Sequence, residues 1–204
     1  MKIAIVGSGI AGLGAAHHLH REGHEITLFE AGDHAGGHVN THQVSLGGHD
    51  YAVDSGFIVF NDWTYPNFIA LLDELGAESQ ASDMSFSVSC GRSGLEYNGA
   101  TFNSLFAQRA NLVNPRFWGM LWDILRFNRE APKLLVEEGN EVSLGDFLTA
   151  GGYGRLFRYY YILPMGAAIW STDPERMLGF PARFFVRFFL NHGLLAVNDR
   201  PVWR

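Results

Sequence analysis

The chain has 204 residues, of which 47% are apolar and 18% are charged, a composition typical of a globular protein and not of a disordered one. Its formal net charge of −6 gives no basic footprint for nucleic acid. A single cysteine, Cys90, excludes an internal disulfide framework and favours a reducing, cytoplasmic location. No stretch approaches 18 uninterrupted apolar residues, so we expect no segment to span a membrane.

The first thirty residues predict a strand, a helix and a second strand. Lys2–Val6 is a short β-branched run that ends at a glycine, as is typical of a strand buried on both faces of a parallel sheet. Ile10–Arg21 has helical spacing, and Gly23 is expected to end the helix in a left-handed conformation. Ile26–Phe29 is the second β-rich run. This order predicts an α/β fold with a Rossmann-like βαβ domain.

The turn after the first strand carries a G-x-G-x-x-G motif. A side chain at Gly7 would strain the turn, one at Gly9 would block a pyrophosphate that approaches the backbone, and one at Gly12 would hold helix and strand apart. The helix start offers unpaired N–H groups to phosphates. Glu30, at the carboxyl end of the second strand, is placed to accept hydrogen bonds from an adenosine ribose. The alternatives are a glycine-rich loop of an unrelated fold and, for the acid, an ordinary solvated loop residue.

A second glycine pair and a hairpin follow. Gly36–Gly37 allows another close approach of backbone to ligand. His42–Leu46 and His49–Val53 are expected to form two strands around the tight turn at Gly47–Gly48, a hairpin that is not part of a plain nicotinamide-binding domain. Phe57–Phe60 is predicted to be a further strand.

The rest of the chain is predicted to be mixed at first and then mostly helical. A helix is expected from Pro66 to its stop at Gly76. The strict alternation of Met84–Cys90 predicts a half-buried strand paired with Leu95–Asn98. Pro115–Phe127 is too apolar all round for a surface helix.

Three helix ends are also predicted beyond residue 140. Ser143 and Asp173 are expected to cap short helices, and Pro181–His192 is predicted to be a helix that Gly193 stops. The final residues, Val202–Arg204, have the pattern of an approaching strand.

The aromatic-rich second half leaves three interpretations open. Tyr159–Tyr161, Trp170 and the phenylalanines of Phe184–Leu190 fill a core, line a cavity for an apolar substrate, or, with Arg183 and Arg187, form an amphipathic helix in a membrane surface. Core packing is the favoured interpretation.

The histidines and Asp54 are candidates without a clear signal. His17, His20 and His24 have helical spacing, but no cysteine or carboxylate completes a coordination sphere, so we expect no metal site. His192 is better explained as a group at a helix end than as a catalytic base. Asp54 caps a turn or lies beside the cofactor, and the sequence favours neither.

The strings GSGIAGLGAAHHL, YPNFIALLDELG, LEYNG, LPMGAAIWS and FFLNHGLL, together with Glu30, Gly36–Gly37, Thr41 and Asp54-x-Gly56, resemble the flavin-dependent amine oxidase and phytoene desaturase superfamily. They are most similar to a bacterial branch described as predicted NAD/FAD-binding, amine-oxidase-like flavoproteins. The resemblance covers the whole chain but only the N-terminal half of such a protein, so the chain is expected to be truncated. It implies FAD as the cofactor.

The resemblance assigns cofactor contacts residue by residue. It implies that the pyrophosphate meets the first glycine turn, the ribose meets the acid, and the glycine pair forms a second phosphate-side loop. It also implies that Gly56 lies near the isoalloxazine. His38 stands where the family often has arginine, and its imidazole cannot make the forked contact of a guanidinium. The cofactor-binding set is Gly7, Ser8, Gly9, Ile10, Ala11, Gly12, Glu30, Ala31, Gly36, Gly37, His38, Thr41 and Gly56.

These observations predict an FAD-dependent oxidoreductase that transfers a hydride from an amine or an apolar unsaturated substrate to flavin. Residues 1–60 would be the FAD-binding βαβ unit with its hairpin, and residues 61–204 a substrate or cap region. No catalytic residue can be assigned. The expected partners are a small-molecule substrate and, at most, a membrane surface. Two alternatives stay open: an NAD-binding dehydrogenase, and a non-catalytic protein that binds a lipid or a protein partner.

Overall fold

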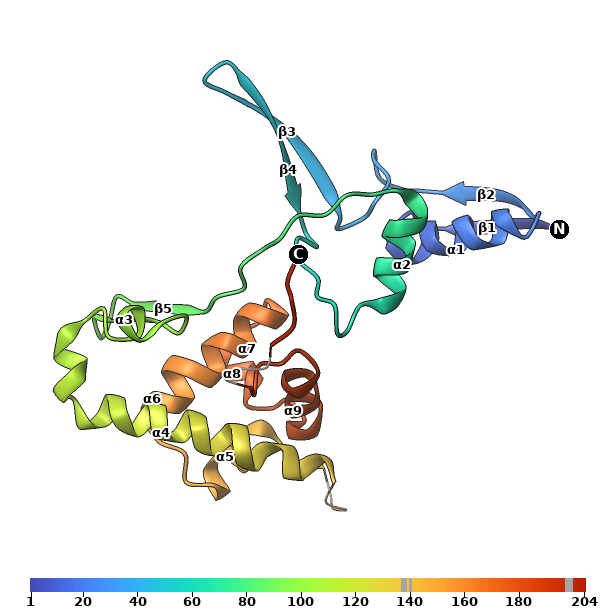
Figure 1. The fold of residues 1–204 in the computed structure, drawn as a ribbon. Coiled ribbons are helices and arrows are strands. Elements are labelled where there is room, and N and C mark those ends of the chain that lie inside the picture. The colour runs from blue at the N-terminus through green and yellow to red at the C-terminus, as the bar shows by residue number, and fades with distance from the viewer. Residues whose placement is uncertain (137–138, 140, 197–199) are drawn as a thin grey trace. The chain divides into compact units, whose positions relative to one another are not determined.

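The computed structural model describes residues 1–136, 139, 141–196 and 200–204. The chain forms two compact units, Met1–Val59 and Phe60–Arg204, called unit 1 and unit 2 below. Figure 1 shows the strands and the long hairpin of unit 1 and the mostly helical unit 2. The expected functional division into 1–60 and 61–204 stays a prediction.

Unit 1 begins with the predicted βαβ arrangement. Strand β1 (Lys2–Val6) and strand β2 (Glu25–Phe29) are joined by helix α1 (Ile10–Arg21). The two strands are parallel and in register from Lys2 opposite Glu25 to Val6 opposite Phe29. Gly23 has a φ of 85° and its N–H donates to the His20 carbonyl, so it ends α1 as expected.

The hairpin of unit 1 is confirmed. Strand β3 (Asn40–Leu46) pairs antiparallel with strand β4 (His49–Ser55). Both turn residues, Gly47 and Gly48, have positive φ angles, of 61° and 81°. That combination is the type I′ turn, whose twist matches that of the two strands.

The expected burial of β1 on both faces is wrong. Val6 is 88% exposed and Phe29 of β2 is 55% exposed. Along both strands, half-buried residues alternate with exposed ones. The reason is that this sheet has only two strands within unit 1, and α1 covers a single face of it.

The expected strand at Phe57–Phe60 is also wrong, because these residues form no ladder. At the start of unit 2, Phe60 exchanges two backbone hydrogen bonds of 2.9 Å with Arg204, and Asn61 forms an isolated antiparallel bridge with Trp203. The last residues of the chain, predicted to begin a strand, therefore pair with residues of unit 2.

Unit 2 continues with helix α2 (Pro66–Leu75) and the hairpin of strands β5 (Ser87–Cys90) and β6 (Leu95–Asn98). The predicted stop at Gly76 is confirmed, with a left-handed φ of 63°. The strand predicted from Met84 begins only at Ser87. Its partner β6 ends at Asn98, which lies opposite Ser87, so the residues before Ser87 lack a ladder partner in the described structure.

The remainder of unit 2 is helical. The predicted caps are confirmed: the Ser143 hydroxyl accepts a hydrogen bond from the Asp146 N–H, and the Asp173 carboxylate accepts one from the Glu175 N–H. The segments are α3 (Phe102–Leu105), η1 (Arg109–Val113), α4 (Pro115–Glu130), η2 (Ala131–Leu135), α5 (Leu144–Ala150), α6 (Arg155–Phe157), η3 (Arg158–Ile162), α7 (Leu163–Trp170), α8 (Pro174–Met177) and α9 (Ala182–Asn191).

These helices enclose an aromatic core. Phe127 and Phe157 have ring centroids 5.5 Å apart, and Phe185 and Phe189 stack at 4.2 Å. All four side chains are fully buried. Core packing, the favoured interpretation of the α9 phenylalanines, is therefore confirmed for Phe185 and Phe189.

Helix α4 differs from its prediction. Its buried side chains are Phe117, Met120 and Phe127, yet Trp118 and Trp122 are 47% and 62% exposed. The sequence places apolar residues all round this helix, but only one side packs against the core of unit 2. No helix among the described residues is both long and apolar enough to cross a membrane.

Candidate functional site

The turn between β1 and α1 depends on three glycines, each for a different reason. Gly7 has a φ of 92°, which only glycine adopts easily, and its N–H donates to the Phe29 carbonyl at 2.7 Å. A Cβ on Gly12 would lie 2.0 Å from the Gly7 carbonyl oxygen, so a side chain there would push helix and strand apart. A Cβ on Gly9 would meet no atom within 4 Å. Gly9 therefore leaves open space in the turn that the fold itself does not need.

The start of α1 faces this open space. Gly9 is the N-cap residue, and no side chain caps the helix there. Ile10 and Ala11, the first two helical residues, are exposed. The first N–H groups of a helix have no intrahelical partner and carry the positive end of its dipole. The turn can therefore bind an anion through its backbone.

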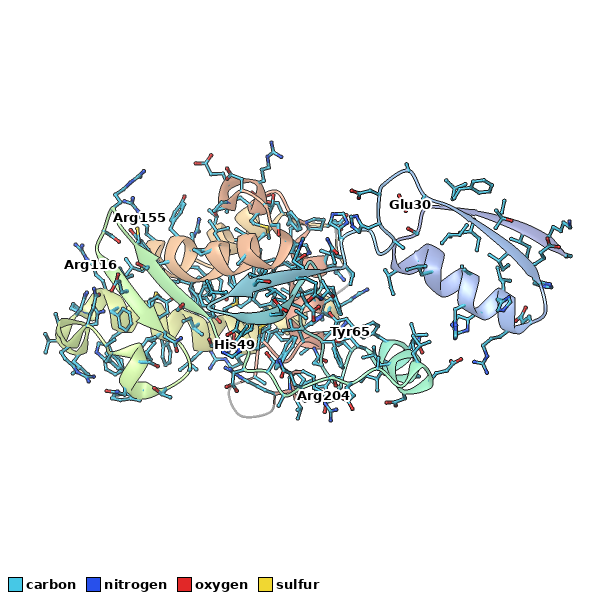
Figure 2. The ribbon with its side chains drawn as sticks, turned by 90° about the horizontal axis from the view of Figure 1, so that it is seen from above. Glu30, His49, Tyr65, Arg116, Arg155 and Arg204 are labelled. Carbon is cyan, nitrogen blue, oxygen red and sulfur yellow. The ribbon has the colours of Figure 1, made fainter. Side chains whose placement is uncertain are left out.

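The carboxylate of Glu30 is held against the same turn (Figure 2). It accepts a hydrogen bond of 2.7 Å from the Ser8 N–H and another from the Ser8 hydroxyl, and its second oxygen accepts one of 2.8 Å from the Gly32 N–H. These donors, the Ser8 hydroxyl first, lower the pKa of Glu30 to about 2. Glu30 is thus a fixed, ionised acceptor at neutral pH. The hydrogen bond from Gly32 was not predicted from the sequence. A glycine two residues after an acid at the end of a strand is the signal that could have revealed it.

The glycine pair lies beside the first turn. The Gly36 N–H donates to the Ser8 carbonyl at 2.8 Å, and Gly9 and Gly36 form a parallel bridge. A Cβ on Gly37 would approach the Gly9 Cα to 3.1 Å, and one on Gly36 would lie 2.3 Å from the Val39 carbonyl oxygen. The two glycine segments, far apart in the sequence, therefore form one continuous backbone surface.

Among the remaining predicted site residues, His38, Thr41 and Gly56 lie at the base of the hairpin. Gly56 has a φ of 85°, and a Cβ there would lie 1.9 Å from the His38 carbonyl oxygen, so Gly56 lets the end of the hairpin pack on that segment. The Thr41 hydroxyl donates to the Asp54 carboxylate at 2.6 Å. Asp54 thus has a cross-strand partner that the sequence did not predict. Ala31 follows Glu30 in the loop and is exposed.

The described residues of unit 2 line two cavities that bear on the predicted site. One, of about 490 Å³, is lined by β5 and by Tyr159 and Tyr160, and the other, of about 400 Å³, by His192 and Trp203. Nδ1 of His192 lies 2.9 Å from the Phe188 carbonyl oxygen, and its ring stacks on Phe188 at 3.9 Å, a structural role at the end of α9. In the part of the chain that the structure describes, no three histidine, cysteine or acidic residues are grouped to hold a metal ion.

Comparison with known proteins agrees with this geometry. Residues 5–75 match the family described as NAD(P)-binding Rossmann-like domain. The flavin-dependent L-tryptophan oxidase of Lentzea aerocolonigenes is 49% identical over 47 residues, which are 23% of this chain and 10% of that protein. The 1-hydroxycarotenoid 3,4-desaturase of a Flavobacterium species is 43% identical over 74 residues, 36% of this chain and 14% of that one.

The fold is similar to solved structures of putrescine oxidase. A triple mutant with redesigned cofactor binding has a TM-score of 0.60 and 22% identity, and the match covers all of this chain and 45% of that one. The wild-type enzyme with bound putrescine has a TM-score of 0.59 and 20% identity. This chain therefore spans less than half the length of the enzyme. The predicted fold class and the resemblance to the amine oxidase and desaturase superfamily are confirmed.

Proposed function

We propose that this chain is the cofactor-binding part of an FAD-dependent oxidoreductase of the amine oxidase and desaturase type, because residues 5–75 match the family described as NAD(P)-binding Rossmann-like domain. One observation carries the proposal. An ionised carboxylate, an open glycine turn and a second glycine loop meet at Ser8, whose hydroxyl donates to Glu30 and whose carbonyl accepts from Gly36. The similarity to a flavin-dependent oxidase and to a carotenoid desaturase supports FAD as the occupant.

The residues present fit the adenosine diphosphate half of that cofactor. The space at Gly9 lets a pyrophosphate approach the backbone and the exposed first turn of α1. Glu30 is ionised and exposed, so its carboxylate can also accept a hydrogen bond from a ribose hydroxyl. The Gly36–Gly37 loop would add backbone contacts beside the phosphates, and His38, Thr41 and Gly56 would lie beyond them toward the rest of the cofactor.

When bound, FAD would supply the hydride-accepting chemistry, with an amine or an apolar unsaturated compound as the donor. The residues of this chain bind and orient the cofactor: the glycine turn holds the phosphates, and Glu30 fixes the position of the sugar. Tyr159 and Tyr160, beside the cavity of about 490 Å³, are the aromatic groups that we propose for contact with an apolar substrate. We assign no proton transfer to a side chain of this chain.

Titration of the 204-residue chain with FAD, NAD⁺ and ADP tests the proposal, with flavin fluorescence and calorimetry as readouts. We expect FAD and ADP to bind. We expect Gly9→Ala to weaken both by at least about tenfold, because a methyl group would occupy the space of the pyrophosphate. Gly14→Ala is the matched control, since a Cβ there also meets no atom within 4 Å but lies inside α1, away from the turn.

The outcomes separate the proposal from its main alternative, an NAD-binding dehydrogenase, which the family description also permits. Binding of NAD⁺ in preference to FAD would identify a nicotinamide-dependent protein. Failure of all three ligands to bind, or equal binding by the Gly9→Ala variant, would overturn the assignment of this site. For the reaction, loss of flavin absorbance at about 450 nm on anaerobic addition of an amine or a carotenoid is the expected result.

A further inference from the structure

Ser8, which lies between the first two glycines of the turn, has a buried side chain that is bonded to Glu30. The residue is 1% exposed. Its hydroxyl and its N–H both donate to the same oxygen, Oε2 of Glu30. A hydroxyl that is covered and already used in this way cannot serve as a contact for a phosphate that approaches Gly9. The Ser8 side chain therefore acts on the carboxylate.

The main chain of Ser8 attaches a second segment to the turn. Its carbonyl accepts a hydrogen bond of 2.8 Å from the Gly36 N–H. The start of the same segment is held by Glu30, because Oε1 of Glu30 accepts a hydrogen bond of 2.8 Å from the Gly32 N–H. The loop of residues 31–37 is thus attached to Ser8 twice, once directly and once through the carboxylate.

The Ser8 hydroxyl also keeps Glu30 ionised. It has the largest effect among the donors that lower the pKa of Glu30 to about 2, ahead of the Gly32 and Ser8 N–H groups. The charged groups beside this carboxylate are Asp33 and His34, whose side chains pair with each other at 2.9 Å. A carboxylate that loses its strongest donor moves more freely and binds a proton more readily.

We propose that Ser8 is a positioning residue of the dinucleotide site, which holds the ribose acceptor and the Gly36–Gly37 loop in their binding positions before the ligand arrives. The inference rests on the proposed function and deepens it, because it assigns Ser8 a role through Glu30 in place of direct contact with the phosphates. A site that is ordered in advance binds more tightly, since fewer groups lose freedom when the ligand binds.

Titration of the 204-residue chain with ADP tests the proposal. ADP is the half that FAD and NAD⁺ share, so the result does not depend on which dinucleotide the chain prefers. We expect Ser8→Ala to weaken ADP binding about tenfold, because it removes a hydrogen bond to a charged group. Ser45→Ala is the matched control. The Ser45 hydroxyl also donates to a carboxylate, that of Asp50, but in the hairpin, so ADP affinity should not change.

A double-mutant cycle with Glu30 separates positioning from general damage to the turn. Glu30→Ala should itself weaken ADP binding. In that background Ser8→Ala should add less than about a twofold loss, because no carboxylate remains to be held. Ser8→Cys keeps a side chain of similar size with a weaker donor, so it should weaken ADP binding nearly as much as Ser8→Ala. It carries the same test if Ser8→Ala does not fold.

The pH dependence of binding is a second readout. Glu30 of the unaltered chain stays ionised down to about pH 4, because its pKa is about 2. In Ser8→Ala the pKa of Glu30 is higher, so the carboxylate binds a proton at a higher pH. The ratio of unaltered to variant affinity for ADP should therefore be larger at about pH 4 than at about pH 7. Titration of ADP itself and of His34 affects both chains alike.

Amide exchange of the ligand-free chain tests the advance ordering directly. The Gly32 N–H, which donates to Glu30, should exchange at least about fivefold faster in Ser8→Ala. The Gly23 N–H, which donates to the His20 carbonyl at the end of α1, should keep its rate. Protection of β1 and β2 in the same experiment shows whether the variant is folded.

Three results would overturn the inference and leave the site itself in place. The first is equal ADP affinity of the folded Ser8→Ala variant and the unaltered chain. The second is the same loss from Ser8→Ala with and without Glu30. The third is an affinity ratio that does not change with pH, together with an unchanged exchange rate at Gly32. Failure of the unaltered chain to bind ADP would instead remove the proposed function as well.

Discussion

The two units of this chain are organised by different forces. In unit 2, side chains such as Phe127, Phe157 and Phe185 are fully buried against one another. In unit 1, all of which the structure describes, Ser8 is the only buried residue. Unit 1 is therefore shaped by backbone hydrogen bonds and glycine geometry, and unit 2 by the burial of apolar surface. The proposed dinucleotide site lies in the unit without a core of its own, where backbone groups remain open to a ligand.

The largest difference between the units is expected in the free energy of unfolding when one aromatic ring is removed from each. Phe127→Ala leaves a cavity among the rings of Phe147, Tyr153 and Phe157, and we expect a loss of about 3–5 kcal/mol in the free energy of unfolding. Phe29→Ala, at a ring that is 55% exposed, should cost less than about 1 kcal/mol. Urea denaturation measures both. Similar losses would contradict the contrast between the units.

Glycine substitutions in the first turn test whether backbone geometry shapes unit 1. Gly12→Ala brings a methyl group against the Gly7 carbonyl, so we expect about 1–3 kcal/mol of destabilisation, seen as faster amide exchange in β1 and β2. Gly9→Ala, which meets no neighbouring atom, should change stability by no more than about 0.5 kcal/mol. If Gly9→Ala unfolded unit 1, loss of ligand binding in that variant could not be attributed to the site.

The acid response of Glu30 is the smallest of these effects. Its pKa of about 2 lies below the ordinary value of 4.5, so its contribution to stability is fully present above about pH 4.5 and is lost as the pH falls toward 2. Ser8→Ala removes the strongest donor and should raise the pKa of Glu30. A carboxyl titration followed by NMR checks both values. An unchanged pKa in the variant would show that the backbone donors alone hold the carboxylate.

Structural features that depend only on neighbouring residues, such as turns and helix ends, were predicted well. Gly23, Gly47–Gly48 and Gly76 adopt the left-handed conformations that end α1, turn the hairpin and end α2. Ser143 and Asp173 cap their helices through their own side chains. Such features depend on local steric and hydrogen-bonding preferences, which a sequence states directly.

Burial was predicted less well, because it depends on which other elements pack against a segment. β1 has the apolar pattern of a strand covered on both faces, yet it is covered on one. Pro115–Phe127 has the pattern of a helix buried all round, yet Trp118 and Trp122 face water. The residues of Phe57–Phe60 have strand propensity, but a strand also needs a partner along its length.

The sequence by itself determined the βαβ unit, the hairpin, the helix ends and the identity of the glycines and the acid at the candidate site, because each follows from steric or hydrogen-bonding preferences of nearby residues. Only the tertiary structure decided that the carboxylate of Glu30 is locked to Ser8 and that Gly36 pairs beside Gly9. It also decided that one apolar side of α4 remains in water. Contacts between residues far apart in the chain depend on how packed elements share surface, which no local pattern specifies.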